Sequence, residues 1–238
     1  MNSEIFSNEL KVKTNQTGIE LNKSQINKFY NYMSLLLEWN EKINLTAITE
    51  PNEVILKHFV DSLTIFKYVE DNTKLIDVGT GAGFPGIPIS ILKENSKITL
   101  LDSLNKRISF LNEVVEELDL KNIETIHSRV EDFGNKERER FDIATSRAVA
   151  ALNVLIEYLL PLVRVGGKCI CMKGSNAEEE IQDAKKAIKI LGGEIEKIEE
   201  IELPGSDIKR TIIIVRKVKE TPKKYPRKAG LPSKEPIK

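Results

Sequence analysis

The chain has 238 residues, of which 40% are hydrophobic and 30% charged, and its formal net charge is zero. This composition is ordinary for a soluble protein, and the length allows one large domain with an extension. The longest apolar stretch, residues 148–163, is too short to span a bilayer, and the first ten residues lack the apolar run of a signal peptide. We therefore expect a cytoplasmic protein without a membrane segment.

The cysteine and histidine content excludes two further classes. Cys169 and Cys171 are one residue apart and cannot join distant segments, so a disulfide framework is excluded. Two His and two Cys also make a metal cluster implausible, and we expect no metal. The spacing of the two cysteines places both on one face of a strand, where they would pack against a helix.

The first 70 residues read as a helical extension. Residues 24–39 carry apolar side chains at the helical period, and residues 51–68 predict a second helix. His58 and Asp61 lie one turn apart on that second helix and could touch. They would form either a surface pair or one wall of an active site.

A strand, a glycine turn and a helix follow within residues 75–91. Residues 75–78 are apolar and β-branched, as in a buried parallel strand, and Gly79, Gly81 and Gly83 form a turn that a Cβ would obstruct. Such a unit lets backbone N–H groups approach a nucleotide-type ligand. Gly81 to Gly86 matches the dinucleotide pattern G-x-G-x-x-G, which is a weak signal alone.

Asp77 distinguishes two candidate ligands. A carboxylate at the end of the first strand would oppose a pyrophosphate, whereas it suits the ammonium group of S-adenosylmethionine. The acid followed by G-x-G-x-G is the first motif of class I methyltransferases. A dinucleotide site and a turn without a ligand remain the alternatives.

Two later segments have the spacing of a nucleoside site. The second strand, residues 98–101, ends at Asp102, and this acid would grip the two ribose hydroxyls or cap the helix that follows. The third strand is residues 123–127, and the loop at 128–133 would lie beside an adenine. A backbone amide at Val130 or Glu131 could then donate to the ring edge.

The remaining elements complete the predicted sheet. A fourth strand at 141–145 leads to Arg147 at the carboxyl edge, where it would meet a ligand or form a structural ion pair. A helix at 149–160, a strand at 168–172 and a helix at 176–191 precede two strands at 194–203 and 211–218, joined as a hairpin. We therefore predict an α/β fold of the class I, Rossmann-like methyltransferase type. Its seven-stranded, mostly parallel sheet would occupy residues 71–220 and end in an antiparallel hairpin.

The last segment is strongly basic. Residues 209–238 hold 11 Lys or Arg and two Glu, and four of the nine prolines follow Thr221. We expect residues 221–238 to stay extended and reach outward. Cations around Tyr225 suit an RNA backbone and an unstacked base, although a solubilising tail is the alternative; these cations are Lys223, Lys224, Arg227 and Lys228.

The sequence also limits the chemistry. It lacks the N/D-P-P-Y/F/W motif of adenine or cytosine amino methylation, and it lacks a Pro-Cys nucleophile loop. Guanine N7 carries a lone pair and no proton, so it can attack a sulfonium methyl without a base. We therefore expect no catalytic acid or base.

Four segments together resemble the RsmG (GidB) family of bacterial rRNA methyltransferases. They are residues 57–63, 77–86, 146–148 and 225–228, and the likeness extends over nearly the whole chain. The resemblance implies methylation of N7 of guanine 527 in the 530 loop of 16S rRNA. Naked 16S rRNA, the 30S subunit and an assembly intermediate stay open as the form of the substrate, and we expect the protein to act as a monomer. Thr80 and Ala229 depart from the family pattern, where Ser and Pro are expected.

The resemblance also implies a set of contacts. Those to S-adenosylmethionine are at Gly79, Phe84, Asp102, Ser103, Val130, Glu131 and Arg147, to which the motif reading adds Asp77 and Gly81. RNA contacts are expected in the tail, and His58, Arg147 and Lys173 are candidates for touching the target base.

Overall fold

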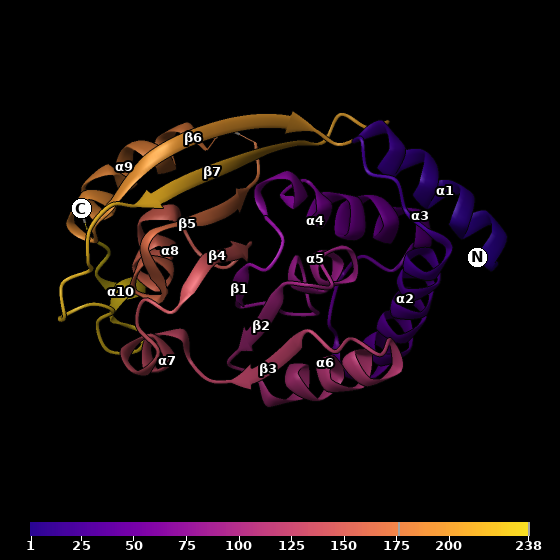
Figure 1. The fold of residues 1–238 in the computed structure, drawn as a ribbon, viewed down its shortest axis with the longest axis horizontal. Coiled ribbons are helices and arrows are strands. Elements are labelled where there is room, and N and C mark those ends of the chain that lie inside the picture. The colour runs from indigo at the N-terminus through magenta and orange to yellow at the C-terminus, as the bar shows by residue number, and fades with distance from the viewer. Residues whose placement is uncertain (176, 238) are drawn as a thin grey trace.

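The computed structural model describes residues 1–175 and 177–237, which form a seven-stranded sheet between two layers of helices (Figure 1). The strand order is β3-β2-β1-β4-β5-β7-β6. Six strands run in the same direction, and β7, between β5 and β6, runs antiparallel to them, so the predicted sheet is confirmed. The strands are β1 (Lys74–Val78), β2 (Lys97–Asp102), β3 (Ile123–His127), β4 (Phe141–Arg147), β5 (Val163–Lys173), β6 (Gly193–Glu202) and β7 (Lys209–Lys217).

The order of the strands reverses between β1 and β4. From β1 the chain proceeds to β2 and β3 on one side, and it then returns to place β4 and β5 on the other. In open α/β sheets a ligand binds outside the carboxyl ends of the strands at such a switch point. The glycine turn after β1 and Arg147 at the end of β4 both lie at this edge.

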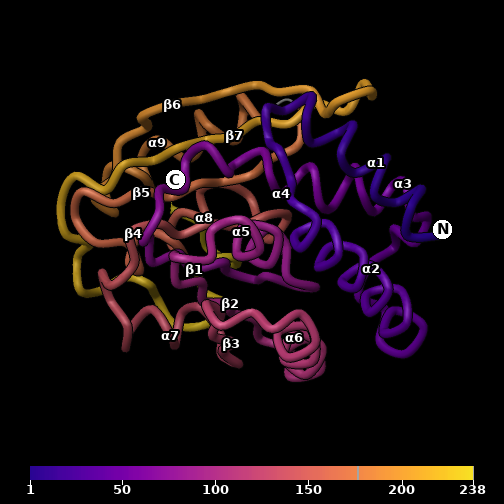
Figure 2. The backbone as a smooth tube through the Cα atoms, turned by 45° about the vertical axis from the view of Figure 1, so that its right-hand side comes forward, coloured from indigo at the N-terminus to yellow at the C-terminus, as the bar shows by residue number. Residues whose placement is uncertain are grey.

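Alternating side chains of each strand enter two different hydrophobic cores. Ile170 faces a core shared with α2 (Lys23–Ile43), α5 (Gly86–Leu92) and α6 (Asn105–Glu117). Cys169 and Cys171 are fully buried in the other core, as expected, with α8 (Leu152–Leu159) and α9 (Glu178–Ile190). This alternation follows from the two-residue period of a strand. Figures 1 and 2 show the two helix layers on opposite sides of the sheet.

The N-terminal helices share the first core with the sheet. The sequence reading missed α1 (Ser3–Gln16), whose Phe6 and Leu10 are fully buried. Both views place α1 beside the turn between β6 and β7 (Figures 1 and 2). The buried Tyr32 hydroxyl of α2 donates to the Ala82 carbonyl of the glycine turn. The extension therefore supports the turn directly.

The second predicted helix is broken into short pieces. They are α3 (Pro51–Val54), the π-helix η1 (Ile55–Val60), α4 (Asp61–Leu63) and the 3₁₀-helix η2 (Phe66–Tyr68). A π-helix widens the turn and changes the direction of its side chains, and such segments are frequent at functional sites. Periodicity in the sequence does not reveal this insertion, because the apolar positions remain nearly helical.

Two local predictions were wrong. Residues 130–133 are not loop but part of α7 (Val130–Lys136). The helix expected from residue 149 begins at Leu152, because Ala151 before it has a non-helical ψ of 152°. Ala148, further upstream, is left-handed (φ +57°). This helix ends in a 3₁₀ turn, η3 (Leu160–Leu162). Asn176, the expected start of the next helix, lies outside the described residues.

The expected extended tail is also wrong. After β7 the chain folds back on α7 and α8, buries Tyr225 and Pro232, and forms α10 (Leu231–Lys234). Lys238 lies outside the described residues. Across the described ranges, no helix combines the length and apolar character needed to cross a bilayer.

Candidate functional site

The glycine turn is held open at the carboxyl edge of the sheet. Gly79, Gly81 and Gly83 have φ angles of +65°, +63° and +98°, which other residues rarely adopt. A Cβ on Gly79 would lie 2.6 Å from Val149 Cγ2, and one on Gly83 would lie 2.7 Å from Tyr32 Oη. The turn therefore needs glycine both for its conformation and for its close neighbours.

Asp77 braces this turn from below. Its Oδ2 accepts hydrogen bonds from Thr80 Oγ1 at 2.6 Å and from the Gly86 amide at 2.8 Å. The carboxylate is completely buried, and Oδ1 has no hydrogen-bond partner among the described residues. Burial raises the pKa of Asp77 to about 6, although these hydrogen bonds and the Arg147 charge oppose the shift. The bracing role is a finding that sequence reasoning missed.

Asp102 holds the turn from the side. Its Oδ2 accepts from the Gly81 amide at 2.9 Å and from Arg107 Nη1 at 3.2 Å, and its Oδ1 accepts from the Leu104 amide. The reading of Asp102 as the helix cap was wrong, because the N-cap of α6 is Leu104 and no side chain caps that helix. The Asp102 carboxylate instead stabilises the turn that precedes α6. The ribose reading stays a prediction, and it is compatible with the position of Asp102 at the wall of two cavities.

Two adjoining cavities lie over the turn and share Gly79, Asp102, Ser103 and Val149. They measure about 410 and 240 Å³, and together they reach the size of a small-molecule site, ~300–1,000 Å³. The first cavity is further lined by Leu45, Thr46, His58, Thr80, Gly81, Ala82, Phe84, Arg107, Arg147 and Ala148. The second is further lined by Val78, Leu101, Ser128, Arg129, Val130, Glu131, Tyr158, Gly230 and Ser233.

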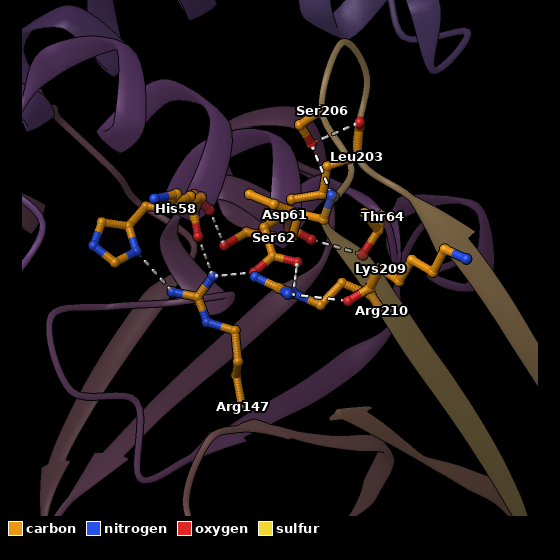
Figure 3. A network of polar contacts seen from close by, with 11 residues as sticks. His58, Asp61, Ser62, Thr64, Arg147, Leu203, Ser206, Lys209 and Arg210 are labelled. Carbon is orange, nitrogen blue, oxygen red and sulfur yellow. Dashed lines mark hydrogen bonds and ion pairs between the residues drawn. The ribbon is translucent and has the colours of Figure 1, made fainter. Parts of the chain in front are cut away.

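Arg147 is fixed at the end of the first cavity by the π-helix and α4. Its Nη1 donates to the Lys57 carbonyl and to Asp61 Oδ2, each at 3.1 Å, and its Nη2 lies 3.2 Å from His58 Nδ1 (Figure 3). The guanidinium carbon stands 5.1 Å from the Phe84 ring centroid. Arg147 is thus a positioned cation rather than a flexible surface charge.

The Asp61 carboxylate pairs with two guanidinium groups, those of Arg147 and Arg210. Its Oδ1 accepts from Arg210 Nε of β7 at 3.0 Å, and it is only 2% exposed (Figure 3). One negative charge against two positive charges leaves a net cation at the cavity end, which suits an anionic ligand group. His58 and Asp61 are both buried, so the surface-pair alternative was wrong.

His58 is a neutral positioning group. Burial, together with the Arg147 charge, lowers the pKa of His58 to about 3. Since Arg147 can only donate, Nδ1 accepts, and Nε2 therefore carries the proton and donates to Thr46 Oγ1 at 2.9 Å. The ring also stacks on Phe84, with centroids 4.5 Å apart. His58 has no free nitrogen to act as a base.

The second cavity gathers the predicted adenine residues. Val130 and Glu131 open α7, and the first N–H groups of a helix have no partner within it. Arg129 provides no side-chain cap there. The Glu131 side chain instead accepts from the Gly230 amide at 2.9 Å.

The predicted RNA residues divide into two groups. Lys223, Lys224 and Lys228 are exposed. Arg227 is instead paired with the buried Glu157, with Nη2 2.6 Å from Oε2. Lys173 lines neither cavity, because it donates to the Ala150 carbonyl and pairs with Glu180.

The Asp77 carboxyl should make stability depend on pH. Its folded pKa, about 6, exceeds its ordinary value of 3.8, so the folded protein binds the extra proton between these values. Its contribution to the free energy of unfolding therefore falls by about 2 kcal/mol as pH rises from 4 to 7. Asp77→Asn keeps an acceptor for Thr80 and Gly86 and removes this loss.

Urea titrations of both proteins at several pH values measure this effect. The variant should gain stability relative to the wild type as pH rises through 4–6. Parallel stability curves for the two proteins would contradict the assignment.

Comparisons with known proteins agree with this geometry. A family model described as rRNA small subunit methyltransferase G (GidB) matches residues 25–212. The ribosomal RNA small subunit methyltransferase G of Acetivibrio thermocellus is 56% identical over 92% of both chains. That of Alkaliphilus oremlandii is 55% identical over 93% of this chain and 94% of its own.

Solved structures with low sequence identity share the fold. A SAM-dependent methyltransferase from Aquifex aeolicus has a TM-score of 0.54 at 16% identity, over 72% of this chain and 96% of its own. TYW2 of M. jannaschii, solved in complex with AdoMet, has a TM-score of 0.55 at 11% identity, over 67% of this chain and 76% of its own. The chain is a methyltransferase and belongs to the rRNA small subunit methyltransferase G family, as its motifs predicted.

Proposed function

We propose that this chain transfers a methyl group from S-adenosylmethionine to N7 of guanine 527 in the 530 loop of 16S rRNA. The family membership supports the reaction class and the rRNA substrate. The base and the atom come from the resemblance of the four motifs. The observation that carries the proposal is the pair of cavities around the glycine turn, with an acid below, an acid beside and a fixed arginine at one end.

The residues of the two cavities fit the methyl donor. Asp77 lines neither cavity, but its Oδ1 lies beneath the turn without a hydrogen-bond partner among the described residues, where its charge would attract an ammonium. The net positive charge around Arg147 suits the carboxylate of the same amino acid. Asp102 borders both cavities, where a ribose would bridge them. The amides that open α7 supply donors for an adenine edge.

The chemistry requires alignment rather than proton transfer. S-adenosylmethionine supplies a methyl group on a sulfonium, and guanine N7 is already a nucleophile. The protein must hold the two in line and exclude water. Neutral His58 holds Arg147 and accepts no proton in this arrangement, which agrees with the expected lack of a catalytic base.

Methyl transfer to small-subunit particles tests the proposed reaction. Particles from a strain that lacks this activity should gain one methyl group, and mass mapping should place it on N7 of guanine 527. Arg147→Ala should lower kcat/KM by about tenfold or more, because the carboxylate contact is lost.

Arg164→Ala is the matched control, since this exposed arginine pairs with Asp142 away from both cavities. It should act like the wild type. A methyl group on another nucleotide would contradict the site, and no transfer to rRNA would contradict the proposed reaction.

The exposed lysines of the tail should provide the salt dependence of RNA binding. Each phosphate contact adds about 0.7 to the slope of log affinity against log salt for single strands. Replacing Lys223, Lys224 and Lys228 with alanine should therefore flatten that slope by about 2.

A matched triple variant uses three exposed lysines of α9, namely Lys185, Lys186 and Lys189. It removes the same charge and should keep the wild-type slope. Equal slopes for all three proteins would mean that the tail lysines do not contact RNA phosphates and serve only to keep the protein in solution.

A further inference from the structure

The C-terminal segment is fastened by a buried carboxylate on α8. Glu157 is fully buried, and it accepts from the Arg227 amide and from Arg227 Nε, each at 2.9 Å. Arg227 Nη2 adds a contact of 2.6 Å to the other oxygen. A buried carboxylate needs such saturation, because unpaired it would be strongly disfavoured.

Three further contacts fasten the same segment on both sides of Arg227. Upstream, Arg138 donates to the Thr221 carbonyl at 2.7 Å and also to the Tyr225 carbonyl. Downstream, the Gly230 amide donates to Glu131, which is 4% exposed. The Tyr225 ring is buried in the core formed with α7 and α8. The segment is therefore part of the packed structure, and its position is fixed.

The fastened segment ends at the second cavity. Gly230 and Ser233 line that cavity together with Ser128–Glu131, and the Ser233 and Tyr158 hydroxyls lie 3.0 Å apart. Gly230 and Ser233 follow the last strand in the chain and form one wall of this cavity. The position of that wall depends on the contacts that Glu157 and Glu131 make with the C-terminal segment.

We propose that Glu157 and Glu131 are positioning residues that hold Gly230 and Ser233 as one wall of the cofactor cavity. The inference rests on the proposed function in one respect, because it takes this cavity as the nucleoside site. It assigns the C-terminal segment a role in cofactor binding, in addition to the RNA binding proposed for its exposed lysines. Arg227 then serves as the link between Glu157 and the wall.

Calorimetric titration with adenosylhomocysteine tests the inference on the full chain. Arg227→Ala breaks the link without leaving an unpaired arginine, and it should weaken binding by about tenfold. Arg227→Lys keeps the charge and should recover part of the loss. In steady state, the KM for the methyl donor should rise while kcat at saturating donor stays near the wild-type value.

A second variant guards against a folding defect. Ser233→Phe leaves every carboxylate contact in place and adds bulk at the cavity wall, so it should also weaken binding, with a thermal midpoint near that of the wild type. Lys234→Ala is the matched control, since it changes an exposed residue of α10 that lines neither cavity, and its affinity should be unchanged.

The outcomes separate the two proposals. Wild-type affinity in both Arg227→Ala and Ser233→Phe, with the wild type binding adenosylhomocysteine, would overturn this inference and leave the proposed function standing. A wild-type protein that binds no adenosylhomocysteine would overturn the proposed function, and this inference with it.

Discussion

The site depends on the glycine-rich turn after β1, which two buried carboxylates hold in place by hydrogen bonds. Asp77 is the penultimate residue of β1 and Asp102 the last residue of β2, and the two acids accept hydrogen bonds from Thr80, Gly81 and Gly86. Because neither acid is solvated, each needs those donors, and the turn cannot move without leaving charge unpaired. Among the described residues, Asp77 Oδ1 has no hydrogen-bond partner, so one oxygen of this carboxylate is left for a ligand group.

At the same edge of the sheet, ion pairs connect the N-terminal helices with the last strand. Asp61 belongs to the N-terminal helices, and its carboxylate pairs both with Arg147 from the middle of the sheet and with Arg210 of the last strand. The extension and the hairpin thus fix one cation together. A division at residue 70 separates sequence regions but does not separate the packing, since the helices and the sheet share one core.

The strands and their mostly parallel arrangement could be predicted because apolar, β-branched runs separated by helical periods leave few arrangements of a sheet. Asp77, Asp102 and Arg147 could be placed at one edge for the same reason. The π-helix was not predictable, since inserting a residue hardly disturbs the apolar pattern. Asp61 was noticed only as a neighbour of His58, because its partners lie 86 and 149 residues away.

The tail shows where composition misleads. Its excess of Lys and Arg predicted an extended segment, yet Tyr225 and the arginine at 227 find buried partners. A signal was present in Glu157, a carboxylate inside an apolar stretch, which needs a cation when it is buried. The sequence does not say which of the many basic residues is that cation.

A crystal structure of the protein with adenosylhomocysteine tests the central claim most directly. The claim requires the amino group toward Asp77, the carboxylate beside Arg147 and the ribose hydroxyls on Asp102. It also places the adenine between the start of α7 and Gly230. A ligand bound outside the two cavities, or lying in the reverse direction with its adenine beside Arg147, would contradict it.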